Sequence, residues 1–491
     1  MDDTDYMTTA TILTFIFYII LMVGIGLYFF WRTKNLSDYV LGGRELSPAV
    51  AALSAGASDM SGWLMLGLPG EIYLSGLNQI WIGIGLTLGA YVNWLLVAGR
   101  LRVFTDSLDN SITIPDYLSR RFQDNSGMIR IVSAFIILIF FTLYIASGMV
   151  AGAVLFENSF DMDYETALMA GSLVIVVYTF LGGFNAVSWT DFIQGILMLG
   201  ALLCVPLVVI YQLGGWTSTI NIIENKQAFY LQPFHELSAL GIISLLAWGL
   251  GYFGQPHILA RFMSIKHVSA VPAARRINII WMILALMGAL MTGFMGIAYF
   301  TSPLDNPETV FIVFTQTLFN PWVAGILLAA ILSAIMSTID SQILVCSSTL
   351  TEDLYYSFIK RNATQSELVW VGRCTVIIIA AIAVMIAMNP QSTILGLVAY
   401  AWAGFGAAFG PVILFSLFSK HMSRTAALTG MVIGASTILI WEQLEGGLFE
   451  LYELLPGFVF ASLAITLIGQ FSKSTKSISK TFTECDQLYR R

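Results

Sequence analysis

The chain has 491 residues, of which 57% are hydrophobic and 11% are charged, with a net charge of −7. Soluble domains carry about a quarter charged residues, so this composition excludes an ordinary soluble protein. The apolar residues occur in runs of about twenty, the length that crosses a hydrocarbon core about 30 Å thick. Because backbone groups in lipid must be bonded within their own segment, each run is predicted to be a helix.

These runs predict an all-α membrane protein with thirteen transmembrane helices, here called spans 1 to 13. In chain order their ranges are 9–31, 47–75, 78–99, 129–156, 165–184, 190–213, 238–260, 277–300, 321–350, 369–388, 392–418, 425–441 and 454–470. Acidic rather than basic residues precede the first run, which is therefore predicted to be a span and not a cleaved signal peptide. Residues 1–471 are predicted to form a single transmembrane transporter domain, and residues 472–491 a short cytoplasmic tail.

The loops between the spans differ in charge. Of the 23 Lys and Arg residues, all except Lys226 fall in the odd-numbered loops, in the adjoining ends of spans 4 and 10 (Arg130 and Arg373) or in the C-terminal tail. The positive-inside rule therefore predicts an external N-terminus and a cytoplasmic C-terminus. A wrong span count would invert every later loop, so this segregation supports thirteen spans independently of hydropathy.

Spans 2 and 7 contain helix-breaking residues at mid-membrane. Span 2 reads ALSAGASDMSGWLMLGLPG from Ala52, and span 7 reads AWGLGYFGQPHI from Ala247. Glycine weakens a helix and proline removes a backbone donor, so both spans are predicted to be discontinuous. Because they lie five helices apart, we expect two inverted five-helix repeats, spans 2–6 and 7–11, each beginning with a broken helix. Such paired breaks indicate the binding site of a carrier.

Asp59, in the break of span 2, is the strongest single indication of function. A carboxylate near the bilayer centre costs at least about 2.5–3.5 kcal/mol on insertion scales, so it needs a partner. It could attract a cation or relay a proton, or it could form a structural hydrogen bond to loosened backbone. Asp191 at the start of span 6 and Asp340 in span 9 are further carboxylates, which could serve transport or be solvated near a helix end.

Aromatic side chains before Pro256 could line a solute site. Trp248 and Tyr252 are four residues apart, so a helix would place them on one face as an apolar wall with polar tips. Aromatic stripes in membrane helices are more often packing, and Tyr144 in span 4 is a weaker candidate. Packing is the interpretation for Trp63, Tyr91, Trp94 and Trp402.

Span 9 offers two adjacent hydroxyls, Ser337 and Thr338, with Ala334 on the same helical face. Backbone carbonyls freed around Ala57 and Met60 in span 2 would complete a set of oxygen ligands. Hard cations prefer such ligands, which hold sodium without burying a net charge. The alternative is that both hydroxyls bond to the preceding turn of their own helix.

The sequence carries no sign of catalysis or of an internal energy source. The four cysteines are scattered and lack metal-ligand or disulfide spacing. It contains no Walker A, Gly-rich nucleotide or HExxH motif, and no loop could hold a further domain. We therefore expect no enzymatic activity, no organic cofactor, no nucleic-acid partner and no obligate protein partner. Active transport would have to draw on an ion gradient.

Six stretches of the chain resemble the sodium:solute symporter family. They are LGGRELSP, LSAGASDMSGWLMLGLPGEIYLSG, TLGAYVNWLLVAGRLRV, YTFLGGFNAVSWTDFIQ, WGLGYFGQPHILARFM and YAWAGFGAAFGPVILFS. The resemblance runs through nearly all of the chain and fails mainly at its ends and in the loops near 215–236 and 301–308. The combination of ASDMSGW with WGLGYFGQPHI is similar to the proline-transporting branch of the family.

The resemblance implies the fold of amino-acid carriers, with one helix before the two repeats and two after them. The sodium ligands that it implies are Ala57, Met60, Ala334, Ser337 and Thr338. Asp59 would be tied to sodium dependence and Asp191 to the ion path, and the role of Arg44 stays open. The solute contacts that it implies are Ser61, Tyr144, Trp248, Tyr252 and Pro256. Where the proline branch has serine and cysteine, this chain has Asp340-Ser341, which removes no expected ligand.

Residues and resemblance together predict sodium-coupled symport of L-proline into a bacterial cell by alternating access. Sodium would be the coupling ion, and the chain would lie in the cytoplasmic (inner) membrane among its lipids. Two alternatives stay open. One is a sodium symporter for another small amino acid or organic solute. The other is a non-transporting membrane sensor, although a sensor would normally carry a signalling domain.

Overall fold

The fold is that of a computed structural model, which describes residues 3–30, 32, 35–181, 183–389, 393–472 and 474–490. Within these ranges the chain is helical, and its only β-type pairing is an isolated bridge between Leu46 and Ile265. The predicted all-α class is therefore confirmed. Some residues used above, at span ends or as loop charges, lie outside the described residues: Trp31, Lys34, Ser392, Lys473 and Arg491.

Ten helical stretches among the described residues are long and apolar enough to cross a membrane. They contain α1 (Asp3–Phe30), α5 (Ile80–Leu96), α8 (Met128–Phe160), α10 (Phe184–Gln212), α14 (Val271–Tyr299), α16 (Pro321–Ser348), α17 (Gln365–Ala387), α18 (Ile394–Phe418), α19 (Arg424–Trp441) and α20 (Leu454–Phe471). Span 5 corresponds to the shorter apolar helix α9 (Tyr164–Leu181), and spans 2 and 7 are interrupted. The count of thirteen spans and the inverted repeats stay predictions.

Shorter helices lie at the ends of the long ones. The α-helices among them are α2 (Leu36–Leu41), α6 (Ala98–Ser107), α7 (Ile114–Arg121), α11 (Trp216–Lys226), α15 (Val310–Leu318) and α21 (Lys476–Arg490). The 3-10 and π-helical segments are η1 (Gly42–Arg44), η3 (Gly76–Gln79), η4 (Ala228–Leu231), η6 (Val268–Ala270), η7 (Pro307–Thr309), η8 (Thr349–Ile359) and η9 (Gly447–Glu450).

Span 2 is broken, as the sequence predicts. Its parts are α3 (Pro48–Asp59), the π-helical turn η2 (Trp63–Gly67) and α4 (Leu68–Ser75). The Ser47 side chain caps the start of α3 by accepting a hydrogen bond from the Val50 N–H. At the other end Met60 leaves the helical region, with φ −85° and ψ 75°. Carbonyl groups in the last turn of α3 therefore lack partners further along the same helix.

Span 7 is broken as well. Its parts are α12 (Ala239–Ala247), the 3-10 helix η5 (Trp248–Gly254) and α13 (Pro256–Ser264). Pro256 takes the first position of α13, where its missing N–H leaves no helical hydrogen bond unmade. Gly251 allows η5 to pack closely on α18, because a Cβ there would lie 1.9 Å from Nε1 of Trp402. The composition of this segment thus explains both its break and its packing.

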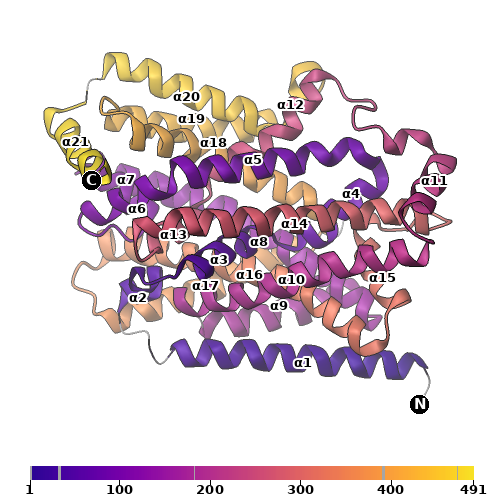
Figure 1. The fold of residues 1–491 in the computed structure, drawn as a ribbon. Coiled ribbons are helices and arrows are strands. Elements are labelled where there is room, and N and C mark those ends of the chain that lie inside the picture. The colour runs from indigo at the N-terminus through magenta and orange to yellow at the C-terminus, as the bar shows by residue number, and fades with distance from the viewer. Residues whose placement is uncertain are drawn as a thin grey trace.

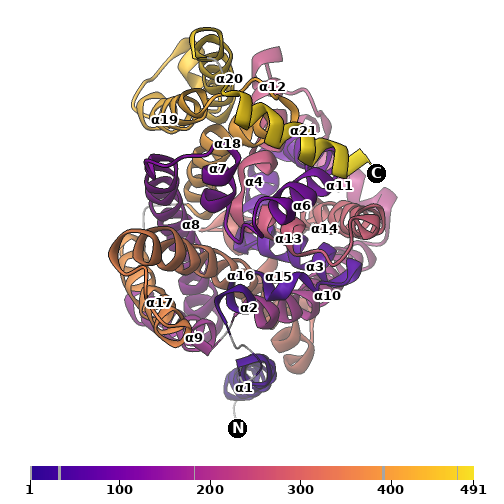
Figure 2. The same ribbon diagram turned by 90° about the vertical axis from the view of Figure 1, so that its left-hand side faces the viewer.

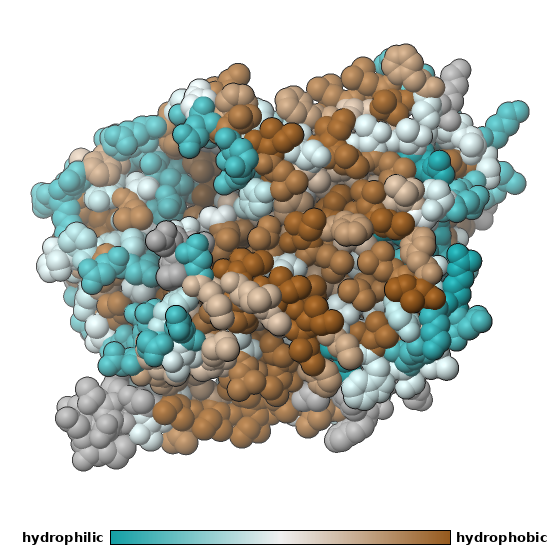
Figure 3. Space-filling view, turned by 180° about the vertical axis from the view of Figure 1, so that it is seen from behind, coloured by the Kyte–Doolittle hydropathy of each residue, from teal (hydrophilic) through white to brown (hydrophobic). Residues whose placement is uncertain are grey.

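The long helices run side by side along one direction, and the start of α1 and the C-terminal helix α21 lie at opposite ends of the bundle (Figure 1). The half-helices α3 and α13 lie in the interior, where nearly all of their side chains are buried. Figure 3 shows hydrophobic side chains gathered in a broad band across the middle of one face, with hydrophilic side chains toward its two ends. That distribution is the one expected of a protein that crosses a membrane along its helix direction.

The predicted polar tail forms a docked helix. In the end-on view α21 lies beside α6 and α7 (Figure 2), and it contacts both of them. Phe482 packs edge-on against Phe104 of α6, with ring centroids 5.7 Å apart. Asp486 pairs with Arg100 at 2.7 Å. The segment is therefore part of the packed structure at this end of the bundle.

Candidate functional site

The end of α3 lies against the middle of α16, where polar groups meet in the interior. The Ser337 hydroxyl donates a hydrogen bond to the carbonyl oxygen of Ala57 at 2.8 Å, and the Thr338 hydroxyl lies 3.4 Å from the same oxygen. Ser337 also contacts the Ala334 carbonyl at 3.1 Å. All four residues and Met60 are buried. The structure thus brings four of the five predicted sodium ligands together, with a released carbonyl facing two hydroxyls, and Met60 lies three residues after Ala57 in the break of span 2.

The Asp59 side chain points to the other neighbour of α3. Its Oδ2 accepts a hydrogen bond from the Tyr252 hydroxyl of η5, and its Oδ1 is buried without a partner. Its backbone carbonyl accepts bonds from Nε1 of Trp63 at 3.2 Å and from the Tyr144 hydroxyl at 3.3 Å. Ser61 follows in the break, with its N–H bonded to the same carbonyl. Three predicted solute contacts therefore gather around Asp59.

Trp248 and Tyr252 do not form the shared wall expected from α-helical spacing, and that prediction was wrong. In a 3-10 helix, residues four apart point about 120° apart rather than about 40°. Trp248 stacks on Tyr452 with ring centroids 5.1 Å apart, whereas Tyr252 meets Trp402 edge-on with ring centroids 5.0 Å apart. Nε1 of Trp402 donates to the Trp248 carbonyl at 2.8 Å and so connects the two positions.

Two cavities lie near the two ends of η5. One, of about 540 Å³, opens among α4, η7 and the start of α18 and is lined by Trp248, Glu71 and Glu308. The other, of about 20 Å³, is lined by Pro256 and Arg261. Tyr252 and Asp59 lie between them along the chain and line neither cavity. Neither of these two cavities therefore reaches the hydrogen bond between Asp59 and Tyr252.

A buried ion pair lies one helical turn beyond the hydroxyl cluster. Asp191 of α10 and Arg261 of α13 are 3.0 Å apart, and neither side chain is exposed. Ser54 of α3 donates to Asp191 at 2.6 Å and accepts from Arg261 at 3.0 Å. Arg261 also donates to Ser341 of α16. The pair therefore joins the same two helices that meet at Ala57 and Ser337, together with α10 and α13.

Comparison with known proteins identifies the family. The family model of the sodium:solute symporter family matches residues 39–434 of the chain. The chain belongs to this family. It is 54% identical to the sodium/proline symporter of Salmonella typhimurium, over 98% of this chain and 97% of that protein. It is 48% identical to the osmoregulated proline transporter OpuE of Bacillus subtilis, over 99% and 100%. Its fold resembles a Na+-coupled sialic acid symporter, solved in a substrate-bound outward-open state, with a TM-score of 0.81, 19% identity and coverage of 95% and 99%.

Three residues close to the site make contacts that the sequence does not predict. Trp63 and Trp402 were interpreted as packing, yet the first binds the Asp59 carbonyl and the second contacts both Trp248 and Tyr252. Arg261 was counted only as a loop charge. Its position five residues after Pro256, among apolar residues, could have indicated a buried charge. The partner Asp191 is 70 residues away in sequence, so no local pattern could supply the pairing.

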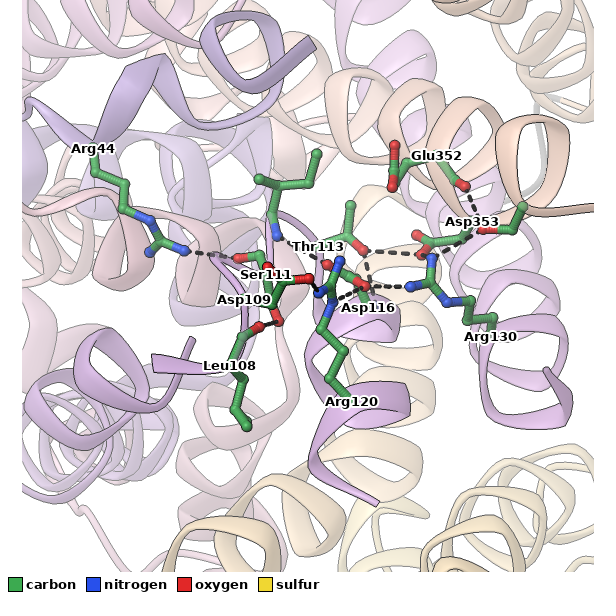
Figure 4. Close-up of polar contacts among 12 residues, drawn as sticks. Arg44, Leu108, Asp109, Ser111, Thr113, Asp116, Arg120, Arg130, Glu352 and Asp353 are labelled. Carbon is green, nitrogen blue, oxygen red and sulfur yellow. Dashed lines mark hydrogen bonds and ion pairs between the residues drawn. The ribbon is translucent and has the colours of Figure 1, made fainter. Parts of the chain in front are cut away.

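The charged network in Figure 4 joins α7, α8 and η8 of this symporter-family fold. Asp116 of α7 binds Arg120 at 2.7 Å and also pairs with Arg130 of α8. Arg130 reaches Asp353 of η8 at 3.2 Å, and the Thr113 hydroxyl donates to the same carboxylate at 3.1 Å. Both carboxylates are buried. The network therefore ties α7 to α8 and to the extension of α16.

Arg44 lies beside that network and connects the two half-helices. Its guanidinium donates to the carbonyl of Ser111 at 2.8 Å (Figure 4) and to the carbonyl of Met263 in α13. Nearby, the Leu46 N–H donates to the Ser264 carbonyl at 3.1 Å. These bonds hold the segment before α3 to the end of α13. The start of α3 is thus joined to the end of α13, whereas the candidate site lies at the end of α3 and the start of α13.

Proposed function

We propose that this chain is a secondary active transporter that couples the inward movement of sodium to the uptake of L-proline by alternating access. The observation that carries the proposal is that one broken helix serves two sites. Ala57 presents its carbonyl to the hydroxyls of α16, and Asp59, two residues later, presents its side chain to η5. Names of relatives at about half identity over the whole chain, sodium/proline symporter and proline transporter, support the choice of ion and solute.

Sodium would be held by Ala57, Met60, Ala334, Ser337 and Thr338. Oxygen ligands from a helix end and from hydroxyls suit this ion, as they do in other carriers with broken helices. Binding there would fix the end of α3 against α16. Because Asp59 lies at the same helix end, its side chain would then be held in place beside Tyr252. We infer that this is how the ion prepares the solute site.

Proline would lie between η5 and the break of span 2. Its carboxylate would meet the first N–H groups of α13, behind Pro256, where the helix dipole favours an anion. Its ring would lie near Trp248 and Tyr252, with Ser61 and Tyr144 close by. Release would require the Arg261–Asp191 pair to separate or shift, because the pair joins α3, α10, α13 and α16 on one side of the site.

The finer architecture belongs to the same proposal. Thirteen spans with inverted repeats 2–6 and 7–11 would give an odd number of crossings, and the start of α1 and the helix α21 lie at opposite ends of the bundle (Figure 1). Together with the basic loops, this supports an external N-terminus and a cytoplasmic C-terminus in a bacterial plasma membrane. In this proposal sodium is the coupling ion, and neither an organic cofactor nor an obligate protein partner takes part.

Uptake by the purified protein in proteoliposomes tests the function. With an inward sodium gradient, labelled L-proline should accumulate transiently above its external concentration. Vesicles with equal sodium on both sides should only equilibrate, and vesicles with potassium in place of sodium should show little uptake. Uptake that ignores the gradient would reject symport, and absence of proline uptake under all conditions would reject the solute.

A further inference from the structure

We propose that Oδ1 of Asp59 accepts a hydrogen bond from the charged amino nitrogen of the solute. Asp59 would then be the residue that selects solutes carrying a cationic amine. The inference rests on the proposed function and deepens it, because it assigns a recognition group to one particular atom of the solute. It also separates the role of Asp59 from that of the sodium ligands two residues away.

The Asp59 carboxylate is buried and has no counter-charge among the described residues. Asp59 is 2% exposed, and within the described part of the chain the one side-chain donor to its carboxylate is the Tyr252 phenol, on Oδ2. No Lys or Arg among the described residues forms an ion pair with it, whereas Asp191 has Arg261 at 3.0 Å. A carboxylate buried without a counter-charge is strongly disfavoured, so the site is incomplete without a cation or a proton.

The Ala57 carbonyl and the Asp59 side chain meet different neighbours of α3. The first meets Ser337 on α16, and the second meets Tyr252 on η5. A sodium ion held by the hydroxyls of α16 therefore lies on the other side of α3. The cation that completes Asp59 must come from the side of η5, where the solute binds.

Oδ1 of Asp59 is the oxygen of this residue that has no hydrogen-bond partner among the described residues. The backbone carbonyl of Asp59 is already bonded by Trp63 and Tyr144, and Oδ2 is already bonded by Tyr252, so Oδ1 is the acceptor left for a ligand. The neighbouring rings of Tyr252 and Trp402 meet edge-on with centroids 5.0 Å apart. A carboxylate oxygen beside aromatic rings is suited to a secondary ammonium, which gains a charged hydrogen bond and cation–π attraction.

The zwitterion would thus meet two complementary ends. Its ammonium would face Asp59 at the end of α3, and its carboxylate would face the first N–H groups of α13. Both half-helices are bonded together near Leu46 and Ser264, which keeps the two recognition groups at a fixed separation. A solute lacking either charge would leave one of them unpaired. The site is therefore expected to discriminate by charge pattern more strongly than by ring shape.

The test compares L-proline with tetrahydrofuran-2-carboxylate, in which a ring oxygen replaces the amino group. Binding of both is measured to the full-length protein in lipid nanodiscs at saturating sodium, and sodium binding is measured separately without solute. The wild type should prefer proline by about 100-fold, which corresponds to ~2.7 kcal/mol. In Asp59→Asn that preference should fall below about tenfold, while sodium affinity without solute changes less than about threefold.

Tyr252→Phe is the matched variant, because it removes the phenol but keeps the charge of Asp59. It should weaken proline binding and yet retain most of the preference for the amine. If Asp59→Asn loses sodium binding and keeps the preference, Asp59 serves the ion and the inference is wrong, although symport stands. If the wild type binds the ether as tightly as proline, the inference is overturned whatever the variants do. If the wild type binds no proline, the proposed function fails instead.

Discussion

Replacing Arg261 with glutamine should abolish sodium-driven uptake and lower the free energy of unfolding. Arg261 and Asp191 are fully buried and 3.0 Å apart, so the substitution leaves a carboxylate in the interior without its counter-charge. Removal of one partner of a buried pair costs ~3–5 kcal/mol. Asp191→Asn should have a similar effect. Thermal unfolding of the purified protein and uptake by proteoliposomes measure the two consequences.

The double variant Asp191→Asn/Arg261→Gln tells structural loss apart from functional loss. It removes both charges, so it should recover much of the stability while uptake stays low. Lys266→Gln is the control, because its partner Glu45 lies 2.6 Å away but the two side chains are 52% and 62% exposed. Exposed pairs contribute about 0–1 kcal/mol, so this variant should resemble the wild type. Equal stability of the single and double variants would contradict the assignment of a buried pair.

Replacing Thr338 with alanine should raise the sodium concentration for half-maximal uptake by at least about tenfold, or ~1.4 kcal/mol. The variant removes one of the two hydroxyls that face the Ala57 carbonyl. At saturating sodium the affinity for proline should stay within about threefold, because the hydroxyl does not face η5. Sodium titrations of labelled proline uptake give both quantities.

Thr292→Ala is the matched control for Thr338→Ala. Thr292 is equally buried in a long helix, but its hydroxyl donates to the Gly288 carbonyl of its own helix, at 2.8 Å. Its loss should leave sodium activation unchanged. If Thr338→Ala had the same sodium dependence as the wild type, the hydroxyl cluster would be a packing feature and the ion would bind elsewhere.

The breaks in spans 2 and 7 could be predicted because their cause is local. Glycine and proline weaken a helix wherever they occur, and the structure leaves the helical path at Met60 and at Gln255. The hydroxyl pair of span 9 was also visible as a pattern. Its approach to Ala57 followed once spans 2 and 9 were expected to meet. Whether these groups bind sodium stays a prediction, which the Thr338 variant tests.

Other features depend on contacts that no local pattern contains. The pairing of Arg261 with Asp191 and the bond from Trp402 to the Trp248 carbonyl join residues far apart in sequence. Trp248 and Tyr252 do not share a face because η5 is a 3-10 helix, which packs against α5 and α18 from distant parts of the sequence. The sequence indicates Asp59 as a functional residue, but its hydrogen bond to Tyr252 is what shows that its side chain faces η5.

In the proposed mechanism sodium and proline bind to two sites that the end of α3 joins. Sodium must therefore strengthen the binding of proline, and proline must strengthen the binding of sodium. The direct measurement is the dissociation constant of proline with and without saturating sodium, together with that of sodium with and without saturating proline. Linkage requires the two factors to be equal, and a coupling of 1–3 kcal/mol makes each about 5–150-fold. Two equal factors in that range would support the account. Proline binding that does not change with sodium would contradict it.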